Sequence, residues 1–262
     1  MNRKIFIKRF IQDFYLVIIM VFLYAPIATM AVLSFNSSKS RTQWGSFTTR
    51  WYRELFSSST IMTALYNTLL IAFLSSLIAV IIGTAAAIAI NSMNRIPRSV
   101  LMGITNIPML NADIVTGISL MLAFIAFRFS LGFQTILISH ITFNIPYVIL
   151  SVMPKLKQTD KSTYEAAMDL GATSVSAFFK VVFPDILPGV LSGFLLAFTM
   201  SLDDFIITHF TRGAGINTLS TLIYSEVRRG IRPSMYALST IIFITVLVLL
   251  LITNFAPKRK KQ

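Results

Sequence analysis

The sequence predicts an all-α membrane protein with six transmembrane helices, and three observations carry this prediction. Hydrophobic residues make up 55% of the chain and its mean hydropathy is +0.74, which leaves too little polar surface to enclose a soluble core of 262 residues. Apolar runs of about 20 residues, the length that crosses a hydrocarbon core as a helix, recur six times. An open sheet cannot satisfy its backbone hydrogen bonds in lipid, so the spans are predicted to be helical.

The predicted spans are residues 14–35, 63–90, 100–127, 133–153, 186–210 and 236–256. A basic stretch precedes the first run, as it would in a secretory signal. This run is longer than the apolar part of a signal, and no small-residue cleavage site follows it. It is therefore predicted to remain in the membrane as a helix.

Basic clusters at residues 3–9 and 258–261 predict the orientation of the chain. Because Lys and Arg close to span ends favour the cytoplasmic side, both termini are predicted to be cytoplasmic. We expect residues 1–62 to hold the N-terminal end, the first helix and an aromatic outer loop of short helices. The core of helices two to six is expected over residues 63–256, followed by a basic cytoplasmic tail over 257–262.

The third and fourth spans are predicted to be irregular. Pro108 and Asn111 interrupt the third, and the fourth contains His140, Asn144 and Pro146. A broken hydrogen-bond ladder is tolerated in a membrane where the freed backbone groups face protein or a water-filled cavity. A kinked bundle with a polar lining follows.

Residues 162–188 form a mostly polar island between the fourth and fifth spans, on the cytoplasmic side in this orientation. Ser162 and Glu165 have the spacing of a capping box, which predicts that a short helix begins there. Gly171 follows where a left-handed C-terminal residue is expected.

A second short helix is expected after that glycine. Thr173 or Ser174 is a suitable N-cap, and Pro184 lacks the backbone amide that a continuing helix needs. We therefore expect Pro184 to end the second helix. Together the two helices would form a compact helix–turn–helix projection.

Three acidic residues are predicted to lie inside the spans: Asp113 in the third, and Asp203 and Asp204 in the fifth. A charge at the centre of a span costs about 2.5–3.5 kcal/mol on insertion scales, so each acid is expected to face an aqueous path or a partner. No Lys or Arg lies deep inside a span to neutralise them. The counter-charge is therefore expected to come from a cationic cargo.

Neighbouring residues on a helix lie about 100° apart, so Asp203 and Asp204 are not expected to point at the same spot. One would line the path while the other caps a helix break or bonds to an adjoining helix. Tyr147 and Phe205 are expected to lie near these acids and to offer their ring faces to a cation. A structural alternative has Asp113 capping the segment after Asn111, and one acid of the fifth span only bonding to a neighbour.

Several kinds of chemistry find no support. The chain has no cysteine, and its two histidines, His140 and His209, make a poor metal site, so no metal or cofactor is expected. An isolated histidine inside a bundle is expected to be hydrogen-bonded. The net charge of +13 is spread over the gaps between spans, as topology signals are, so no nucleic-acid partner is expected.

No catalytic residue is expected either. The sequence lacks the G-x-S-x-G and H-E-x-x-H motifs, and adjacent acids cannot form the facing dyad of an aspartyl protease. These absences weigh against an intramembrane hydrolase. A G-x-x-x-x-G-K-[ST] loop is absent as well, so ATP would have to be hydrolysed by a separate chain.

The polar island carries a motif made of Glu165, Ala166, Ala167, Gly171, Val181, Phe183 and Pro184. This pattern resembles the EAA loop of membrane subunits of binding-protein-dependent ABC importers. The family has Ile and Leu where this chain has Val181 and Phe183. In that family the loop is the coupling helix that sits in a cleft of the cytoplasmic ATPase.

Further stretches resemble the second permease of spermidine/putrescine importers. They are residues 35–38, 51–52, 113–115, 139–143, 201–205, 222–225, 228–233 and 237–240. The resemblance implies a type I importer permease fold in a bacterial inner or plasma membrane, a paralogous permease, two copies of an ATPase and an external polyamine-binding protein. It also implies alternating access driven by ATP.

Two alternatives stay open at this point. The first is an ABC importer permease with another substrate, in which the acids are structural. The second is an ion-coupled secondary transporter that uses Asp113 or Asp203 as a proton or sodium site. The second alternative predicts uptake that persists without an ATPase and collapses with the ion gradient.

Overall fold

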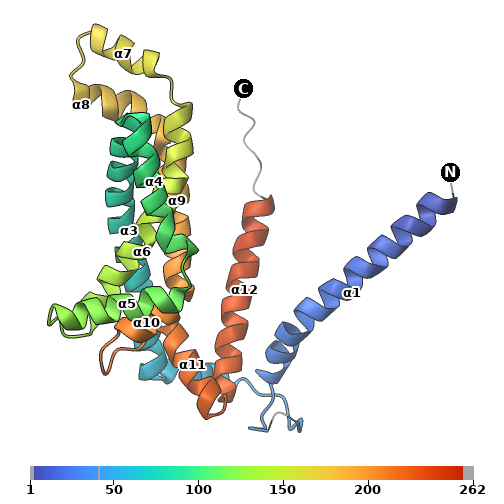
Figure 1. Ribbon diagram of the computed structural model, residues 1–262. Coiled ribbons are helices and arrows are strands. Elements are labelled where there is room, and N and C mark those ends of the chain that lie inside the picture. The colour runs from blue at the N-terminus through green and yellow to red at the C-terminus, as the bar shows by residue number, and fades with distance from the viewer. Residues whose placement is uncertain (1–2, 41, 256–262) are drawn as a thin grey trace. The chain divides into compact units, whose positions relative to one another are not determined.

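The computed structural model describes residues 3–40 and 42–255, and these are almost entirely helical (Figure 1). The elements are α1 (Arg3–Leu33), α2 (Arg50–Ser57), α3 (Ser59–Ser92), α4 (Arg95–Leu110), α5 (Asp113–Ala126), α6 (Phe133–Gln158), α7 (Lys161–Asp169), α8 (Ser174–Ala177), the π-helix η1 (Phe178–Val182), α9 (Phe183–Asp203), α10 (Ile206–Thr211), α11 (Leu219–Arg229) and α12 (Pro233–Phe255). The chain falls into two compact units. One comprises Thr63–Tyr224, and the other comprises the described residues up to Met62 and from Ser225 onward.

Among the described residues, four helical segments are long and apolar enough to cross a membrane: Asp13–Leu33, Ser59–Ser92, Phe133–Gln158 and Ser174–Asp203. The α4–α5 pair is a fifth candidate, because the two helices pass the same test together. In α12 the apolar segment Pro233–Val248 is shorter. The chain is therefore a multi-pass membrane protein, and its sixth span stays a prediction. The predicted tail over 257–262 lies outside the described residues.

The third predicted span is interrupted, as expected, but it is not one straight helix. Helix α4 ends at Leu110, Asn111 has an extended backbone, and α5 begins at Asp113 at an angle of 103° to α4. Pro108 lies inside the last turn of α4, where its missing amide weakens the ladder. The interruption predicted within the span over 100–127 is confirmed, and the sharp bend between the two helices was not predicted.

The fifth span also differs from its predicted form. Pro184 does not end a helix: α8, η1 and α9 run on as one helical segment from Ser174 to Asp203. In an α-helix a proline ring clashes with the carbonyl four residues earlier, here that of Lys180. Lys180 lies within the π-helical turn Phe178–Val182, whose wider backbone leaves room for the ring. The helix then stops at Asp203, so the predicted span over 186–210 is broken near its end.

Helices α3, α6 and α9 form the core of the unit Thr63–Tyr224, and α6 and α9 lie side by side along their length (Figure 1). Their buried apolar side chains include Ala79, Ala87, Val148, Val152, Ile186, Val190 and Ala197. Small residues let the helix backbones approach closely. A Cβ added at Gly83 of α3 would lie 2.8 Å from the Cβ of Val148 on α6.

Gly83→Ala is therefore expected to lower the thermal midpoint of the detergent-solubilised protein. Overpacking a filled interior costs about 1–3 kcal/mol, which outweighs the gain of about 1 kcal/mol in helix propensity at most helical sites. Gly103→Ala in α4 is the matched control, because no atom lies within 4 Å of the Cβ that it would add. Equal midpoints for the two variants would contradict the close α3–α6 packing.

The predicted outer loop contains the short helix α2, as expected, and Asn36 organises the turn before it. The buried Asn36 side chain donates to the carbonyl of Gln43 (2.9 Å) and accepts from the amides of Ser38 (3.1 Å) and Gly45 (2.8 Å). Its own carbonyl accepts from the indole nitrogen of Trp51 at 2.7 Å. Asn36 thus holds the turn through its side-chain amide and ties it to α2 through its backbone carbonyl.

Candidate functional site

A cavity of about 350 Å³ lies in the unit Thr63–Tyr224, where the break between α4 and α5 meets the break between α9 and α10. Its lining consists of Pro108, Asp113, Thr116, Phe143, Tyr147, Met200, Asp203, Asp204, Phe205, Ile206 and Ile207. The five residues predicted from the sequence to line a substrate path are all among them. The α4–α5 break contributes Asp113 and the α9–α10 break contributes Asp203 and Asp204, so the three acids line one cavity.

The carboxylate of Asp113 is exposed at the start of α5. The N-cap position of this helix is occupied by Ala112, so Asp113 stands in the first turn and does not cap the helix. The alternative in which this aspartate caps the segment after Asn111 is thus wrong. A negative charge is favoured at this end of a helix, because the first backbone amides point outward there.

Asp203 and Asp204 are adjacent but differently placed. Asp203 is the last residue of α9 and is exposed, whereas Asp204 has an extended backbone and is partly buried. The Asp204 carboxylate accepts hydrogen bonds from the amides of Ile207 (3.3 Å) and Thr208 (2.8 Å) and from the hydroxyl of Thr208 (2.8 Å). It thereby satisfies free amides of the first turn of α10, the capping role predicted for one of the two acids.

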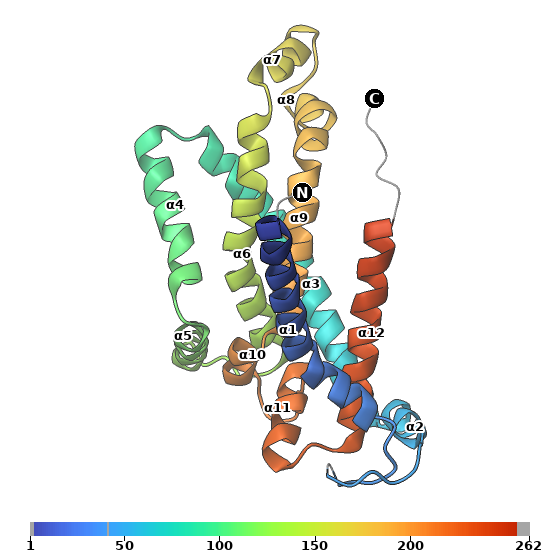
Figure 2. The same cartoon turned by 90° about the vertical axis from the view of Figure 1, so that its right-hand side faces the viewer.

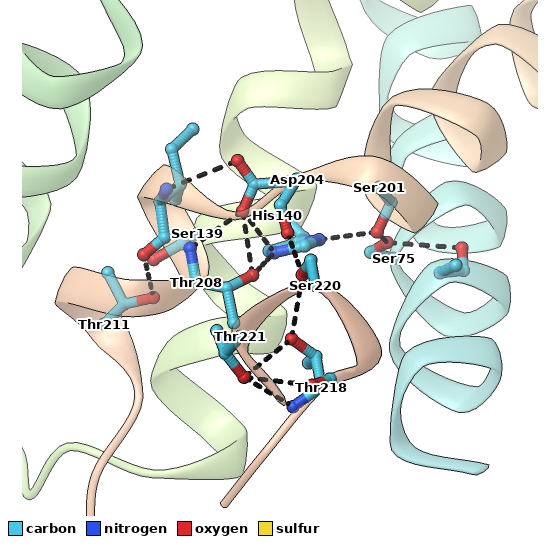
Figure 3. Close-up of polar contacts among 12 residues, drawn as sticks. Ser75, Ser139, His140, Ser201, Asp204, Thr208, Thr211, Thr218, Ser220 and Thr221 are labelled. Carbon is cyan, nitrogen blue, oxygen red and sulfur yellow. Dashed lines mark hydrogen bonds and ion pairs between the residues drawn. The ribbon is translucent and has the colours of Figure 1, made fainter. Parts of the chain in front are cut away.

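His140 on α6 joins this carboxylate to the rest of the bundle (Figure 3). Its side chain is 1% exposed, and Nε2 lies 2.9 Å from the Thr208 hydroxyl and 3.4 Å from an Asp204 carboxylate oxygen. The other ring nitrogen, Nδ1, is hydrogen-bonded to the Ser201 hydroxyl, which lies 3.1 Å from the hydroxyl of Ser75 on α3. The expectation that an interior histidine is hydrogen-bonded is confirmed.

Two aromatic residues predicted at the path occupy the cavity wall. Tyr147 is half-buried on α6, and Phe205 follows the two acids in the break before α10. The ring of Phe205 packs against Tyr224 (centroids 4.3 Å apart) and His209 (5.3 Å). These contacts fix the Phe205 ring at the edge of an acidic cavity, an arrangement that suits a cation.

The chemistry available in the cavity is electrostatic. Three carboxylates line it, and no Lys or Arg side chain among the described residues does so. Within the same described part of the chain, no group of three or more His, Asp or Glu side chains is placed to hold a metal ion. The cavity can therefore attract and hold an organic cation.

The residues predicted to couple to an ATPase lie elsewhere. Glu165, Ala166 and Ala167 are on α7, at the end of α6 and α9 opposite α10, and the whole projection stands clear of the bundle (Figure 2). Gly171 has φ +85°, the left-handed conformation expected for it. Pro184 lies further along, in the first turn of α9.

The predicted capping box is wrong, and the helix begins earlier. Asp160 is the N-cap of α7, and its carboxylate accepts from the amide of Ser162 at 3.0 Å. The Ser162 amide and then its hydroxyl lower the pKa of Asp160 below its ordinary value. A charged carboxylate at this position complements the helix N-terminus, so it is preferred over the serine two residues later. Thr173 caps α8 as predicted, accepting from the Ser176 amide.

Residues 79–261 of the chain match the protein family described as "Binding-protein-dependent transport system inner membrane component". The chain is 40% identical over 228 residues to the putrescine transport system permease protein PotI of Escherichia coli (strain K12), with 84% of this chain and 81% of PotI covered. It is 34% identical over 253 residues to the spermidine/putrescine transport system permease protein PotC of Haemophilus influenzae, with 97% and 98% covered.

The fold has a counterpart among solved structures. The chain superimposes with a TM-score of 0.71 on a chain of a bacterial ABC transporter involved in the import of the acidic polysaccharide alginate. That match covers 99% of this chain and 98% of the other at 17% sequence identity. At this identity the likeness concerns the fold alone.

Proposed function

Because the chain belongs to the family of binding-protein-dependent transport system inner membrane components, we propose that it forms one half of the channel of an ATP-driven polyamine importer. The cargo would be putrescine or spermidine, which carry several positive charges. The observation that carries this proposal is the cavity that gathers Asp113, Asp203 and Asp204 without a basic side chain in the described lining. The names of the relatives PotI and PotC point to the same cargo class.

The lining, and not the fold, argues for a cationic cargo. A chain of an alginate importer shares this fold, and alginate is an acidic polysaccharide. An anion would meet three carboxylates here, and like charges brought together in a site of low dielectric are strongly disfavoured. A polyamine instead supplies the counter-charge that the spans lack.

The energy would come from other chains. We propose two ATPase copies below the membrane, a paralogous permease that completes the pore and an external binding protein that delivers the cargo. The α7–α8 projection is the surface proposed to contact the ATPase. It exposes apolar side chains that a soluble loop would normally bury, among them Leu170 (90% exposed) and Val175 (67% exposed).

The test is uptake of radiolabelled putrescine into proteoliposomes that contain the complete importer and its loaded binding protein. Uptake is expected with ATP and is expected to stop when a non-hydrolysable ATP analogue replaces it. Proteoliposomes with this chain alone and an imposed proton or sodium gradient are the control. Uptake in that control would favour an ion-coupled transporter, and an active importer that ignores putrescine and spermidine would overturn the cargo.

Cysteine labelling is expected to give the orientation of the projection. The chain has no cysteine, so Ser174→Cys introduces a unique thiol on an exposed residue. A membrane-impermeant maleimide is expected to label it in inside-out vesicles and not in spheroplasts, because the α7–α8 projection is proposed to be cytoplasmic. Ser57→Cys in the outer loop is the matched control and is expected to react in spheroplasts. Labelling of Ser174→Cys from outside would reject the proposed topology.

A further inference from the structure

A network of hydrogen-bonded polar side chains lies in the bundle next to the cavity acids, and the proposed transport cycle gives it no role. It joins Ser75 on α3, His140 on α6, Ser201 on α9 and Thr208 on α10 to the carboxylate of Asp204 (Figure 3). Apart from the half-buried Asp204, its members are buried. This network therefore connects the four helices at the level of the break between α9 and α10.

We propose that His140 and Thr208 are positioning residues for cargo binding: they hold Asp204 against the bundle so that the neighbouring Asp203 presents its carboxylate to the cavity. This inference rests on the proposed polyamine transport. It decides which of the two adjacent acids has which role, a choice that the sequence alone leaves open. Asp203 meets the cargo, whereas Asp204 fixes the helix break.

The geometry supports this division of roles. The extended backbone at Asp204 separates α9 from α10, and its carboxylate is held by the Thr208 amide and hydroxyl, each at 2.8 Å. Its carbonyl accepts from the Ser220 hydroxyl at 2.7 Å, which adds a contact to α11. The carboxylate and the carbonyl of Asp204 are thus both held at the break, and the exposed Asp203 precedes it as the last residue of α9.

The hydrogen-bond inventory explains why both His140 and Thr208 are needed. The Thr208 hydroxyl has one proton, which it donates to Asp204, so its lone pairs are left to accept from Nε2–H of His140. The Ser201 hydroxyl can then donate to Nδ1 of a neutral imidazole. Every group in the network is satisfied in this assignment. Removing the Thr208 hydroxyl takes one hydrogen bond from the carboxylate and leaves Nε2–H of His140 only the Asp204 oxygen 3.4 Å away, a longer contact than the 2.9 Å bond that it loses.

Thr208→Val and Thr208→Ser form the decisive pair of variants. Valine keeps the shape of threonine without the hydroxyl, whereas serine keeps the hydroxyl without the methyl group. In the complete importer, Thr208→Val is expected to lower putrescine uptake per ATP hydrolysed by about tenfold, the ratio for losing a hydrogen bond to a charged group. Thr208→Ser is expected to retain most of the uptake. If Thr208 only fills space, the order is reversed, and that result would overturn the proposal.

A second pair covers the case in which Thr208→Val does not assemble. His140→Gln keeps a donor and an acceptor, whereas His140→Leu keeps neither, and uptake per assembled complex is expected to be higher for glutamine. Equal uptake in this pair would overturn the positioning role. The wild-type importer separates the two proposals: if it moves no polyamine, the cargo is wrong, whereas wild-type rates in Thr208→Val with an active wild type reject only the positioning role.

Discussion

Asp203→Asn is expected to lower putrescine uptake by the complete importer by about 100-fold. The side chain ends α9 at the cavity, exposed and without the capping bonds that hold Asp204, so its charge is available to the cargo. A hydrogen bond between charged groups contributes up to about 3 kcal/mol, and each 1.4 kcal/mol corresponds to a factor of ten. The measurement is the initial rate of uptake in proteoliposomes, with ATP hydrolysis followed in parallel.

Asp13→Asn is the matched control for this experiment, because it removes one negative charge from an exposed residue of α1. Its uptake is expected to equal that of the wild type. Asp113→Asn should behave like Asp203→Asn, since both carboxylates line the same cavity. Unchanged uptake in the variants of both cavity acids would show that the cargo does not depend on these charges, and the cargo would then be neutral or anionic.

Gly171→Val is expected to separate ATP hydrolysis from uptake. Gly171 has φ +85°, and a β-branched residue is strained in this region by about 1–2 kcal/mol, so the turn between α7 and α8 should rearrange. Uptake is expected to fall by about tenfold, whereas ATP hydrolysis continues because the proposed ATPase is a separate chain that the substitution leaves unchanged. Gly171→Asn should keep more uptake, since asparagine tolerates the left-handed conformation better than other residues.

Gly215→Val provides the control for strain itself. Gly215 has nearly the same backbone conformation, φ +89°, but lies in the loop between α10 and α11, away from the projection. Its substitution is expected to reduce the yield of protein without separating hydrolysis from uptake. If Gly171→Val behaves in the same way as Gly215→Val, the α7–α8 projection has no coupling role. Glu165→Ala is expected to show the same separation as Gly171→Val.

Local patterns predicted much of the architecture and the composition of the cavity. Apolar runs located the long helices, and the rarity of acids within spans singled out Asp113, Asp203 and Asp204, since charge in a membrane is too costly to be incidental. Gly171 was recognisable because a helix end followed by glycine has a specific backbone requirement. Each of these signals lies within a few residues of the feature that it predicts.

The predictions that were wrong or missing have two causes. Either two local signals compete, or the feature depends on contacts between residues that are distant in sequence. Asp160 replaced Ser162 as the cap of α7 because two capping residues compete and the charged one wins. Pro184 does not end the helix, because a π-helical turn precedes it and accommodates its ring, and no local sequence pattern predicts such a turn. His140 and Asp204 are 64 positions apart, and only the packing of α6 against the α9–α10 break brings them together. The serines and threonines around them look like ordinary helix residues.

The unbroken helical segment Ser174–Asp203 has a mechanical consequence. Within it, the 21 residues of α9 rise about 1.5 Å each, so they make an arm of about 32 Å with η1 at one end and Asp203 at the other. A pivot of about 10° would carry one end of α9 through roughly 5–6 Å relative to the other. Movement of the end proposed to contact the ATPase would thus displace Asp203 through the rigid helix, with no relay of small side-chain shifts in between.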